Sequence, residues 1–374
     1  MDNHRSTWAE IDLGAIRSNL YQVINLLDPA TKIMAVVKAN AYGHGLLPVA
    51  KTCLEAGASY LGVATLDEAL ELRDHGIEAP ILILGQIPYQ CAALAIEREI
   101  ELTVPDGETA VAVAKAAQKV GKPARIHIKL DTGMGRIGFT ADDSSVHDIL
   151  HIAGLQGLDI KGIFSHLATA DSKDKSYAKQ QIDAFKRYTD RLKQEGLSIP
   201  IRHLANSAAI MDLPEAQFEM VRSGIITYGL YPSDEVQKER LSLVPAMRLI
   251  SRISFLKSIP AGSSVSYGRT FISSKEIRVA TVPIGYADGY SRLLSNRAYA
   301  VVNHIRVPLI GRVCMDQCMF DVSEVPDVKV GDEIILFGRP EDGVTADHLA
   351  AWMDTINYEI VCMPGSRIPR FYRS

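Results

Sequence analysis

The first two-thirds of the chain alternates short apolar runs with amphipathic stretches, and this alternation constrains the fold more than any other feature. Two of the amphipathic stretches, residues 64–76 and 106–121, place apolar residues at helical spacing and end on a glycine, a frequent helix stop. Strands that alternate with helices indicate right-handed βαβ units and a parallel sheet. The strand-like runs lie at residues 32–39, 60–65, 80–85, 100–104, 124–132, 159–167, 201–206 and 220–229.

The number of these runs decides between two architectures. An open, doubly wound sheet would explain the alternation, but it gives no reason for eight strands. Eight βα units close into a barrel. We therefore predict an α/β protein with a TIM-type (β/α)8 barrel over residues 14–235.

The pattern changes in the last third of the chain. Runs rich in β-branched and aromatic residues follow one another there without helices between them, separated by turn signals such as Asp288-Gly289. We predict a mainly antiparallel β domain over residues 236–374, with one late helix at 345–355. The opening strand, residues 6–13, is left over from the barrel count, and we expect it to pair into this C-terminal domain.

Composition excludes several classes of protein. With 374 residues, 47% of them hydrophobic and 22% charged, the chain suits a two-domain globular protein. A net charge of −4 without a Lys/Arg run argues against a nucleic-acid partner, and no stretch approaches the ~20 apolar residues of a membrane span. The N-terminus is polar, without the apolar core of a signal peptide. Five scattered cysteines indicate reduced thiols in a cytoplasmic protein, and we expect no metal site.

The stretch AVVKANAYGHG, residues 35–45, ends an apolar run on Lys38 and continues with small side chains. The simplest interpretation is a strand whose solvent end carries a charge, because lysine is mostly a surface residue. In a dry pocket, however, a lysine loses its proton and can form a Schiff base with an aldehyde cofactor. The residues at the ends of the other predicted strands distinguish a surface lysine from a Schiff-base lysine.

Reactive groups of such barrels gather at the carboxyl ends of the strands. Those ends carry Lys38, Tyr42, Lys129, Asp131, Arg136, His166, His203, Asn206, Ser207, Arg222 and Gly224. The loops after the seventh and eighth strands form the frequent phosphate site, where the Ser207 hydroxyl and the backbone N–H groups of Gly224 and Ile225 could hold a phosphate. A phosphate-bearing aldehyde opposite a lysine indicates pyridoxal 5′-phosphate.

A competing motif, G-x-G-x-x-G, occupies residues 133–138 directly after a strand and matches a dinucleotide fingerprint. The strand is the fifth of its domain rather than the first, and no helical pattern opens inside the motif. These glycines are better explained as a tight loop, so we do not expect a nicotinamide cofactor.

Residues 35–45 also resemble the cofactor-lysine signature of alanine racemases, and this match is highly specific. Further segments resemble that family along the whole chain: HIKLDTGMGRIGF, FSHLATAD, HLANSAA, VRSGIITYGLYP, SVSYGRTF, GYADGY, GRVCMDQ and INYEIVC. The resemblance implies a TIM-type barrel followed by a β domain. It further implies a cytoplasmic homodimer that interconverts L-alanine and D-alanine, the latter a peptidoglycan precursor, with pyridoxal 5′-phosphate.

The same resemblance assigns roles to individual residues. Lys38 and Tyr267 are the two catalytic bases, and Tyr267 reaches the site from the partner subunit. Arg136 and Met315, the latter again from the partner, contact the substrate, and Lys129 is a carbamylated lysine. The cofactor contacts implied are Lys38, Tyr42, His166, Ser207, Arg222, Gly224, Ile225 and Tyr358.

The chemistry explains these residue types. Racemisation removes the α-proton from one face of the substrate and returns a proton to the other, so two bases on opposite sides suit it. Tyr267 serves as a base only if a neighbouring cation favours its ionised form, and His166 or an arginine are the candidates. Arg222 opposite the pyridine nitrogen donates a hydrogen bond and discourages protonation there, which should suppress side reactions.

Plainer interpretations remain open for single residues and for the whole protein. Arg222 could form a salt bridge inside the barrel, Lys129 could pair with Asp131, and His203 could be a second-layer partner of Arg222. The protein could be a serine or broad-specificity racemase, or a decarboxylase of the same architecture. From another class, it could be a non-catalytic pyridoxal phosphate carrier, although such a barrel has no use for the β domain.

Overall fold

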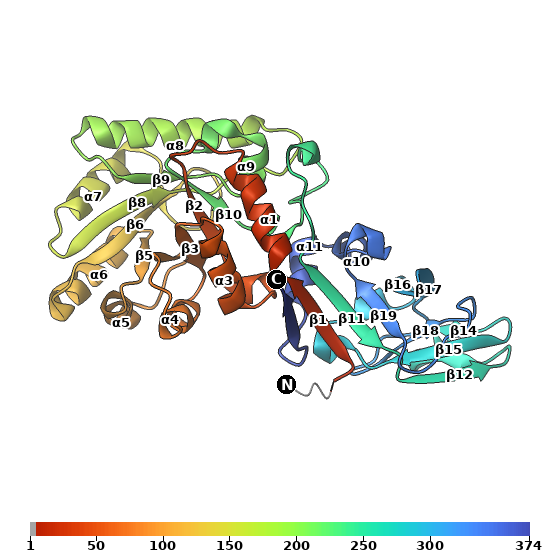
Figure 1. The fold of residues 1–374 in the computed structure, drawn as a ribbon. Coiled ribbons are helices and arrows are strands. Elements are labelled where there is room, and N and C mark those ends of the chain that lie inside the picture. Colours follow the sequence, from red (N-terminus) through yellow and green to blue (C-terminus); the bar gives the residue numbers. More distant parts are fainter. Residues whose placement is uncertain (1–4) are drawn as a thin grey trace. The chain divides into compact units, whose positions relative to one another are not determined.

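The computed structural model describes residues 5–374 and divides the chain into two compact units (Figure 1). The first comprises residues 16–41 and 46–243, and we call it the barrel unit. The second, the β unit, comprises the chain up to Ala15, residues 42–45 and residues 244–374. Within residues 5–374 no helix is both long and apolar enough to cross a membrane.

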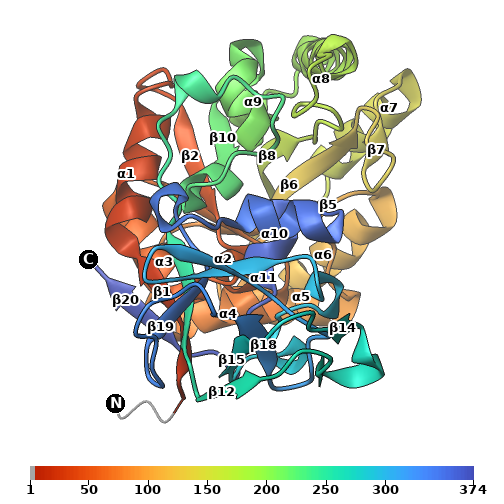
Figure 2. The same ribbon diagram turned by 90° about the vertical axis from the view of Figure 1, so that its right-hand side faces the viewer.

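A closed parallel barrel forms the centre of the barrel unit. Its strands pair in the order β5-β4-β3-β2-β10-β9-β8-β6, and pairing of β6 with β5 closes the ring (Figures 1 and 2). The strands are β2 (Lys32–Val36), β3 (Tyr60–Val63), β4 (Ile81–Ile83), β5 (Glu101–Val104), β6 (Ala124–Asp131), β8 (Leu158–Phe164), β9 (Ile201–His203) and β10 (Met220–Ser223). The predicted eight-stranded barrel is thus confirmed, with a short extra strand, β7 (Phe139–Thr140), beside β6.

One helix, α1, precedes the first barrel strand and the others follow barrel strands, and their ends show the expected signals. They are α1 (Leu13–Ile24), α3 (Leu46–Glu55), α4 (Leu66–Asp74), α5 (Ala92–Glu97), α6 (Gly107–Val120), α7 (Asp143–Ala153), α8 (Ser176–Gln194) and α9 (Ser207–Asp212). The Thr65 side chain caps α4 in a capping box with Glu68, and the Asp106 carboxylate caps α6. Gly121 ends α6 with φ 74°, a left-handed conformation that glycine adopts without a Cβ penalty.

Apolar and polar side chains share the inside of the barrel. An apolar cluster draws on six strands and consists of Met34, Tyr60, Leu82, Phe164, Ile201 and Met220. Several polar side chains are buried at 4% exposure or less: Glu101, His127, Lys129, His203 and Arg222. Because buried polar groups are stable only when they are paired, these residues need defined partners.

The β unit contains three sheets. The largest pairs in the order β17-β16-β19-β11-β1-β20, the second is β12-β15-β18, which Figure 2 shows side by side, and the smallest is β13-β14. Its strands are β1 (Thr7–Asp12), β11 (Met247–Arg252), β12 (Phe255–Ile259), β13 (Ser264–Val265), β14 (Phe271–Ile272), β15 (Ile277–Val282), β16 (Tyr299–Val302), β17 (Ile305–Pro308), β18 (Cys318–Asp321), β19 (Glu333–Phe337) and β20 (Arg370–Arg373). All pairings are antiparallel except β1 with β20.

One predicted turn of this unit is confirmed, and one helix was not predicted. Strand β15 ends at Val282, and the chain enters a 3-10 turn, η6 (Tyr286–Asp288), at the turn signal Asp288-Gly289, because Gly289 takes φ 99° and Asp288 accepts the Gly285 N–H. The late helix is present as α10 (Ala346–Met353), but a second one, α11 (Asn357–Cys362), follows it and was not expected.

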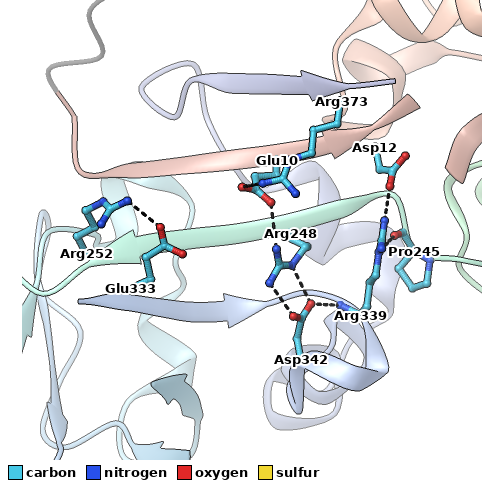
Figure 3. A network of polar contacts seen from close by, with 9 residues as sticks. All are labelled: Glu10, Asp12, Pro245, Arg248, Arg252, Glu333, Arg339, Asp342 and Arg373. Carbon is cyan, nitrogen blue, oxygen red and sulfur yellow. Dashed lines mark hydrogen bonds and ion pairs between the residues drawn. The ribbon is translucent and has the colours of Figure 1, made fainter. Parts of the chain in front are cut away.

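A network of charged residues holds the N-terminal strand in the large sheet (Figure 3). Arg248 on β11 donates two hydrogen bonds to Asp342, at 2.9 and 2.7 Å, and one to Glu10 on β1 at 3.1 Å. Arg339 reaches Asp12 at the end of β1. The carboxylates of Glu10 and Asp342 are 12% and 11% exposed, so Arg248 neutralises two largely desolvated charges.

An Arg248→Ala substitution tests this network. Removing the shared guanidinium leaves two partly buried carboxylates without it, and we expect a loss of about 1–3 kcal/mol in the free energy of unfolding. Arg252, on the same strand, pairs with Glu333 at 2.7 Å, but both side chains are about half exposed. Arg252→Ala should therefore lose under about 1 kcal/mol. Chemical denaturation of both variants makes the comparison, and equal losses would contradict the network's role.

Candidate active site

Lys38 stands where the first barrel strand gives way to an unusual turn. β2 ends at Val36, and the short element α2 (Lys38–Tyr42) has left-handed backbone geometry. The four residues after the lysine have φ between 51° and 54°, and the first three of them have ψ between 46° and 54°. Left-handed turns of L-residues cost roughly 1–2 kcal/mol per residue. Such a turn persists only where its surroundings hold it.

Two side chains hold this turn within the barrel unit. Glu68, at the start of α4, accepts the Ala39 N–H at 2.6 Å, and the Asn40 side chain accepts the Leu46 N–H at 2.8 Å. Asparagine is one of the few residues besides glycine that adopt the left-handed region readily, which suits Asn40 to this turn.

Arg222 on β10 is the hub of the polar cluster inside the barrel. Its Nη2 donates to the carbonyls of Ser165 and Leu204, at 2.8 and 3.0 Å, and contacts His166 Nδ1 at 3.2 Å. Its Nη1 donates to the His203 carbonyl at 2.8 Å and contacts His203 Nδ1 at 3.2 Å. The contact predicted between Arg222 and His203 is present. These partners are carbonyl oxygens and imidazole nitrogens rather than carboxylates. The contacts therefore differ from the salt bridge that was considered from the sequence.

Lys129 on β6 lies in the same cluster. Its side chain is buried, Nζ donates to the Leu130 carbonyl at 2.5 Å, and the ammonium lies 5.4 Å from the centre of the Phe164 ring. Burial, and then the nearby Arg222 charge, lower the pKa of Lys129 to about 7. A substantial fraction of this amine is therefore neutral at neutral pH.

His166 follows β8 and faces the cations of the cluster. Burial, followed by the charges of Arg222 and Arg136, lowers the pKa of His166 well below its ordinary value. The ring is neutral at neutral pH, and its Nδ1 faces a guanidinium donor. The expectation that His166 could be the cation that ionises Tyr267 is therefore wrong, and an arginine is left as the candidate.

The loop after β6 carries Arg136, whose side chain is exposed. Asp131 organises this loop, because its Oδ1 accepts the N–H groups of residues 133, 134 and 135 at 2.8–3.1 Å. The carboxylate considered as a partner for Lys129 is thus engaged with backbone. The glycines form a loop that leads into β7, and α7 starts only at Asp143, which agrees with a tight turn rather than a dinucleotide fingerprint.

The expected phosphate-holding residues meet between β9 and β10. The Ser207 hydroxyl accepts the Gly224 N–H at 3.0 Å, and both residues are buried together with Ile225. Ser207 opens α9, capped by the Asn206 side chain, which accepts the Ala209 N–H at 3.0 Å. A hydroxyl and backbone amides thus converge at the loops where barrels of this kind hold phosphate.

In the β unit, Tyr42 and Tyr358 lie together, with ring centres 6.1 Å apart. Tyr42 is buried, and burial raises the pKa of its phenol, so the hydroxyl stays protonated as a hydrogen-bond donor. The chain passes closely here, because a Cβ built on Gly43 would lie 2.1 Å from the Val361 carbonyl oxygen, and its φ is 79°. Only glycine fits this position.

Tyr267 and Met315 lie on the surface of the β unit, at 68% and 53% exposure. Tyr267 opens a 3-10 turn, η5 (Tyr267–Arg269), after Ser266, whose hydroxyl donates to the Arg312 carbonyl at 2.6 Å. The Met315 carbonyl accepts the Ala287 N–H at 3.0 Å. Both residues are thus presented outward by hydrogen-bonded loops.

Some residues that support the cluster were not found from the sequence. Gln181, on α8, accepts the Ala168 N–H at 2.8 Å and donates to the His166 carbonyl at 3.1 Å. Ser165 and Thr132 join the loops after β8 and β6 through a 2.8 Å hydrogen bond between their hydroxyls. Their positions directly after or at strand ends were the available signal. Within residues 5–374 no group of three metal-ligating side chains is gathered.

The barrel unit gathers a lysine, a buried arginine and a neutral histidine at its strand ends, and the chain adds a mainly antiparallel β unit. These features define a class of two-domain barrel enzymes. Residues 11–232 match the model of the alanine racemase N-terminal domain, and residues 246–372 match that of the alanine racemase C-terminal domain. The chain belongs to the alanine racemase family, and it is an isomerase.

Similar proteins agree over nearly the full length. An alanine racemase of Clostridium perfringens is 50% identical over 371 residues, covering 99% of this chain and 96% of its own, and one of Desulforamulus reducens is 49% identical over 98% of both. The solved alanine racemase of Clostridium difficile 630 superposes with a TM-score of 0.96 at 43% identity, covering 100% of this chain and 97% of its own. A Bacillus anthracis alanine racemase solved with bound L-Ala-P has a TM-score of 0.94 at 39% identity, covering 100% and 96%.

Proposed function

We propose that this protein interconverts L-alanine and D-alanine with pyridoxal 5′-phosphate held by Lys38. The barrel over residues 14–235 would bind the cofactor, and the β domain over residues 236–374, completed by strand 6–13, would complete the site of a partner subunit. The observation that carries the proposal is the cationic cluster at the strand ends. Names of solved relatives support the substrate class, since one is described as bound to L-Ala-P and another to cycloserine.

The residues of the cluster fit such a cofactor. Burial, followed by the charges of Arg222, Arg136, Lys129 and Lys38, lowers the pKa of His166, and burial, followed by the Arg136 charge, lowers the pKa of Arg222 to about 9. Crowded cations of this kind are relieved by an anion. The phosphate and phenolic oxygens of pyridoxal phosphate and the carboxylate of an amino acid supply that anionic charge. Ser207, Gly224 and Ile225, with Tyr42 and Tyr358, would hold the phosphate, and His166 would lie against the cofactor.

Two bases would divide the proton transfer. When bound, pyridoxal phosphate withdraws electrons from the substrate Cα and so makes the α-proton removable. Lys38 Nζ would take or give a proton at one face of the Cα, and Tyr267 Oη of the partner subunit at the other. Arg136 and the Met315 backbone would orient the carboxylate, so that the Cα faces both bases.

Arg222 would suppress side reactions such as transamination. Its pKa of about 9 keeps the guanidinium protonated at neutral pH, and a guanidinium has donors but no acceptor. Facing the pyridine nitrogen, it would donate to that nitrogen rather than protonate it. Arg222 would thereby leave that nitrogen unprotonated, which would favour return of the proton to the Cα over transamination.

The exposure of Tyr267 and Met315 supports a homodimer. A base that acts in a water-excluded site cannot work at 68% exposure, so a second chain would have to cover it. The residue would then belong to the partner's site, and catalysis would require the dimer. The five cysteines are free thiols, which supports a reducing compartment such as the cytoplasm.

The proposal is tested with purified holoenzyme and L-alanine in deuterated water, by following optical rotation and loss of the α-proton together. Rotation that decays to zero with deuterium incorporation is expected. Proton exchange with retained rotation would mean that one base works alone. Neither signal in protein with bound cofactor would favour the carrier alternative, and a panel with serine and larger amino acids would decide specificity.

Lys129 is proposed to be carbamylated. Its amine is partly neutral at neutral pH and flanked by Arg222 and Arg136, which would favour an anionic carbamate. With [13C]bicarbonate we expect a carbamate carbon resonance that grows as pH rises through about 7, because only the neutral amine reacts. Lys38→Ala should keep this resonance and Lys129→Met should lose it. A spectrum without the resonance above pH 8 would refute the modification.

A further inference from the structure

Behind Arg222, a line of buried polar groups runs through the barrel to its opposite end. His203 Nδ1 contacts Arg222 Nη1 at 3.2 Å, and His203 Nε2 lies 2.9 Å from His127 Nδ1. His127 Nε2 lies 2.8 Å from Glu101 Oε2. Both imidazole rings are 0% exposed and Glu101 is 2% exposed. Four strands, β10, β9, β6 and β5, contribute one residue each.

The protons in this line can be assigned from chemistry alone. A guanidinium has no acceptor, so His203 Nδ1 must accept, and the proton of the neutral ring sits on Nε2. That N–H donates to His127 Nδ1, which places the proton of His127 on its own Nε2, where it donates to Glu101. Burial, and then the neighbouring His127 and Arg222, lower the pKa of His203 well below its ordinary value, which agrees with a neutral ring. All hydrogen bonds of the line therefore point the same way, from Arg222 as the first donor to Glu101 as the last acceptor.

The strand arrangement of the barrel leaves room for this line of hydrogen bonds. Strand β8 separates β6 from β9, and the β6–β8 pairing shifts register between Ile126 and His127, which sets His127 opposite Gly162. A Cβ on Gly162 would lie 2.3 Å from His127 Nδ1 and 2.8 Å from the Ile201 carbonyl oxygen. A glycine inside a strand weakens it and marks a close approach. Here its missing side chain lets the two imidazoles meet across β8, while Phe164 stacks on His203 at 4.7 Å between ring centres.

We propose that Glu101 and His127 are positioning residues for Arg222: with His203 they form a directed hydrogen-bond line that ends on a carboxylate and holds the guanidinium in one orientation. The inference rests on the proposed function only for the group that Arg222 would face, which is the pyridine nitrogen of the cofactor. It assigns a role in the reaction to two residues that are remote from the carboxyl ends of the strands. Neither contacts the substrate, and each acts through its neighbour in the line.

The tautomers give a test that does not depend on activity. Long-range 1H–15N correlation spectra of holoenzyme labelled at histidine report which ring nitrogen carries the proton, with assignments from His127→Phe and His203→Phe. We expect both rings to be protonated at Nε2 only. In Glu101→Gln the amide oxygen still accepts, so both tautomers should persist. In Glu101→Leu the acceptor is gone, so we expect the His127 Nε2 proton to lose its partner and exchange faster with solvent, while Arg222 still fixes the tautomer of His203.

Kinetics on the same proteins test the consequence. In metal sites, the outer partners that orient a ligand typically change activity 10–100-fold, and by analogy Glu101→Leu should lower kcat by about that factor, while Glu101→Gln should recover most of the loss. Thr103→Val is the control, because Thr103 is buried on the same strand and its hydroxyl donates to the Ile83 carbonyl at 2.6 Å rather than to a residue of the line. It should keep kcat within about twofold, since such a substitution removes a neutral hydrogen bond away from the line.

Three results would overturn the inference: a proton on His127 Nδ1 in the unaltered protein, a Glu101→Leu protein indistinguishable from Thr103→Val, or a Glu101→Gln protein as impaired as Glu101→Leu. A protein with the expected tautomers and no racemase activity would instead refute the proposed function and leave the line intact. The two failures are therefore distinguishable.

Discussion

A Lys38→Ala protein is expected to lose covalent attachment of pyridoxal phosphate and to lose racemisation by at least ~10³-fold, since the same residue would tether the cofactor and serve one face of the substrate. The structure gives a reason why no other lysine can replace it. Lys38 alone lies at the head of the left-handed turn, which Glu68 fixes to the start of α4. Lys129, although buried in the same cluster, directs Nζ to the Leu130 carbonyl.

The measurement has two parts. Borohydride reduction followed by unfolding should leave the cofactor on the unaltered chain and release it from Lys38→Ala, while optical rotation reports activity. Lys32→Ala is a matched control, because Lys32 opens the same strand at its other end and is exposed. Its attachment and activity should equal those of the unaltered protein. Covalent cofactor that survived in Lys38→Ala would disprove the assignment.

The fold could be predicted to the extent that periodicity determines it. The alternation of apolar runs and helical stretches defined all eight barrel strands, because most of these runs are buried on both faces and stand apart from their helices. In the β unit the turn predicted at Asp288-Gly289 is present, although apolar residues continue past Val282, where strand β15 ends, into this turn that depends on Gly285, Asp288 and Gly289. Turn chemistry there overrides the apolar pattern.

The candidate site was predictable only where it touches strand ends. Lys38, Lys129, His166 and Arg222 were found because barrel chemistry gathers there. His127 lies in mid-strand, in β6, where buried residues run without alternation, so the sequence does not separate an inward polar residue from its neighbours. Gly162 was the one available signal, since a glycine within a strand indicates close approach. Which side chain approaches Gly162 depends on the tertiary structure and cannot be seen in the sequence.

The outward position of Tyr267 leads to the second large effect. Tyr267→Phe should lower racemisation by about 10²–10⁴-fold, the usual contribution of a general acid–base group, because the phenyl ring keeps the shape and loses only the hydroxyl. Exchange of the α-proton at the Lys38 face should fall less than racemisation does. Tyr21→Phe, an exposed tyrosine on α1, is the control and should retain full activity. Equal losses of exchange and racemisation would contradict the division into two faces.

Mixing the two inactive proteins decides whether the site is shared between chains. If Tyr267 acts in the partner's site, a dimer of one Lys38→Ala chain and one Tyr267→Phe chain contains one site with both bases and one with neither. Random exchange of subunits should then restore about a quarter of the unaltered activity, since half of the dimers are mixed and each has one intact site of two. Sites built within a single chain would yield no recovery. Recovery that rises with the time allowed for subunit exchange, and that is absent when either variant is incubated alone, would therefore assign the exposed Tyr267 hydroxyl to the site of the neighbouring chain.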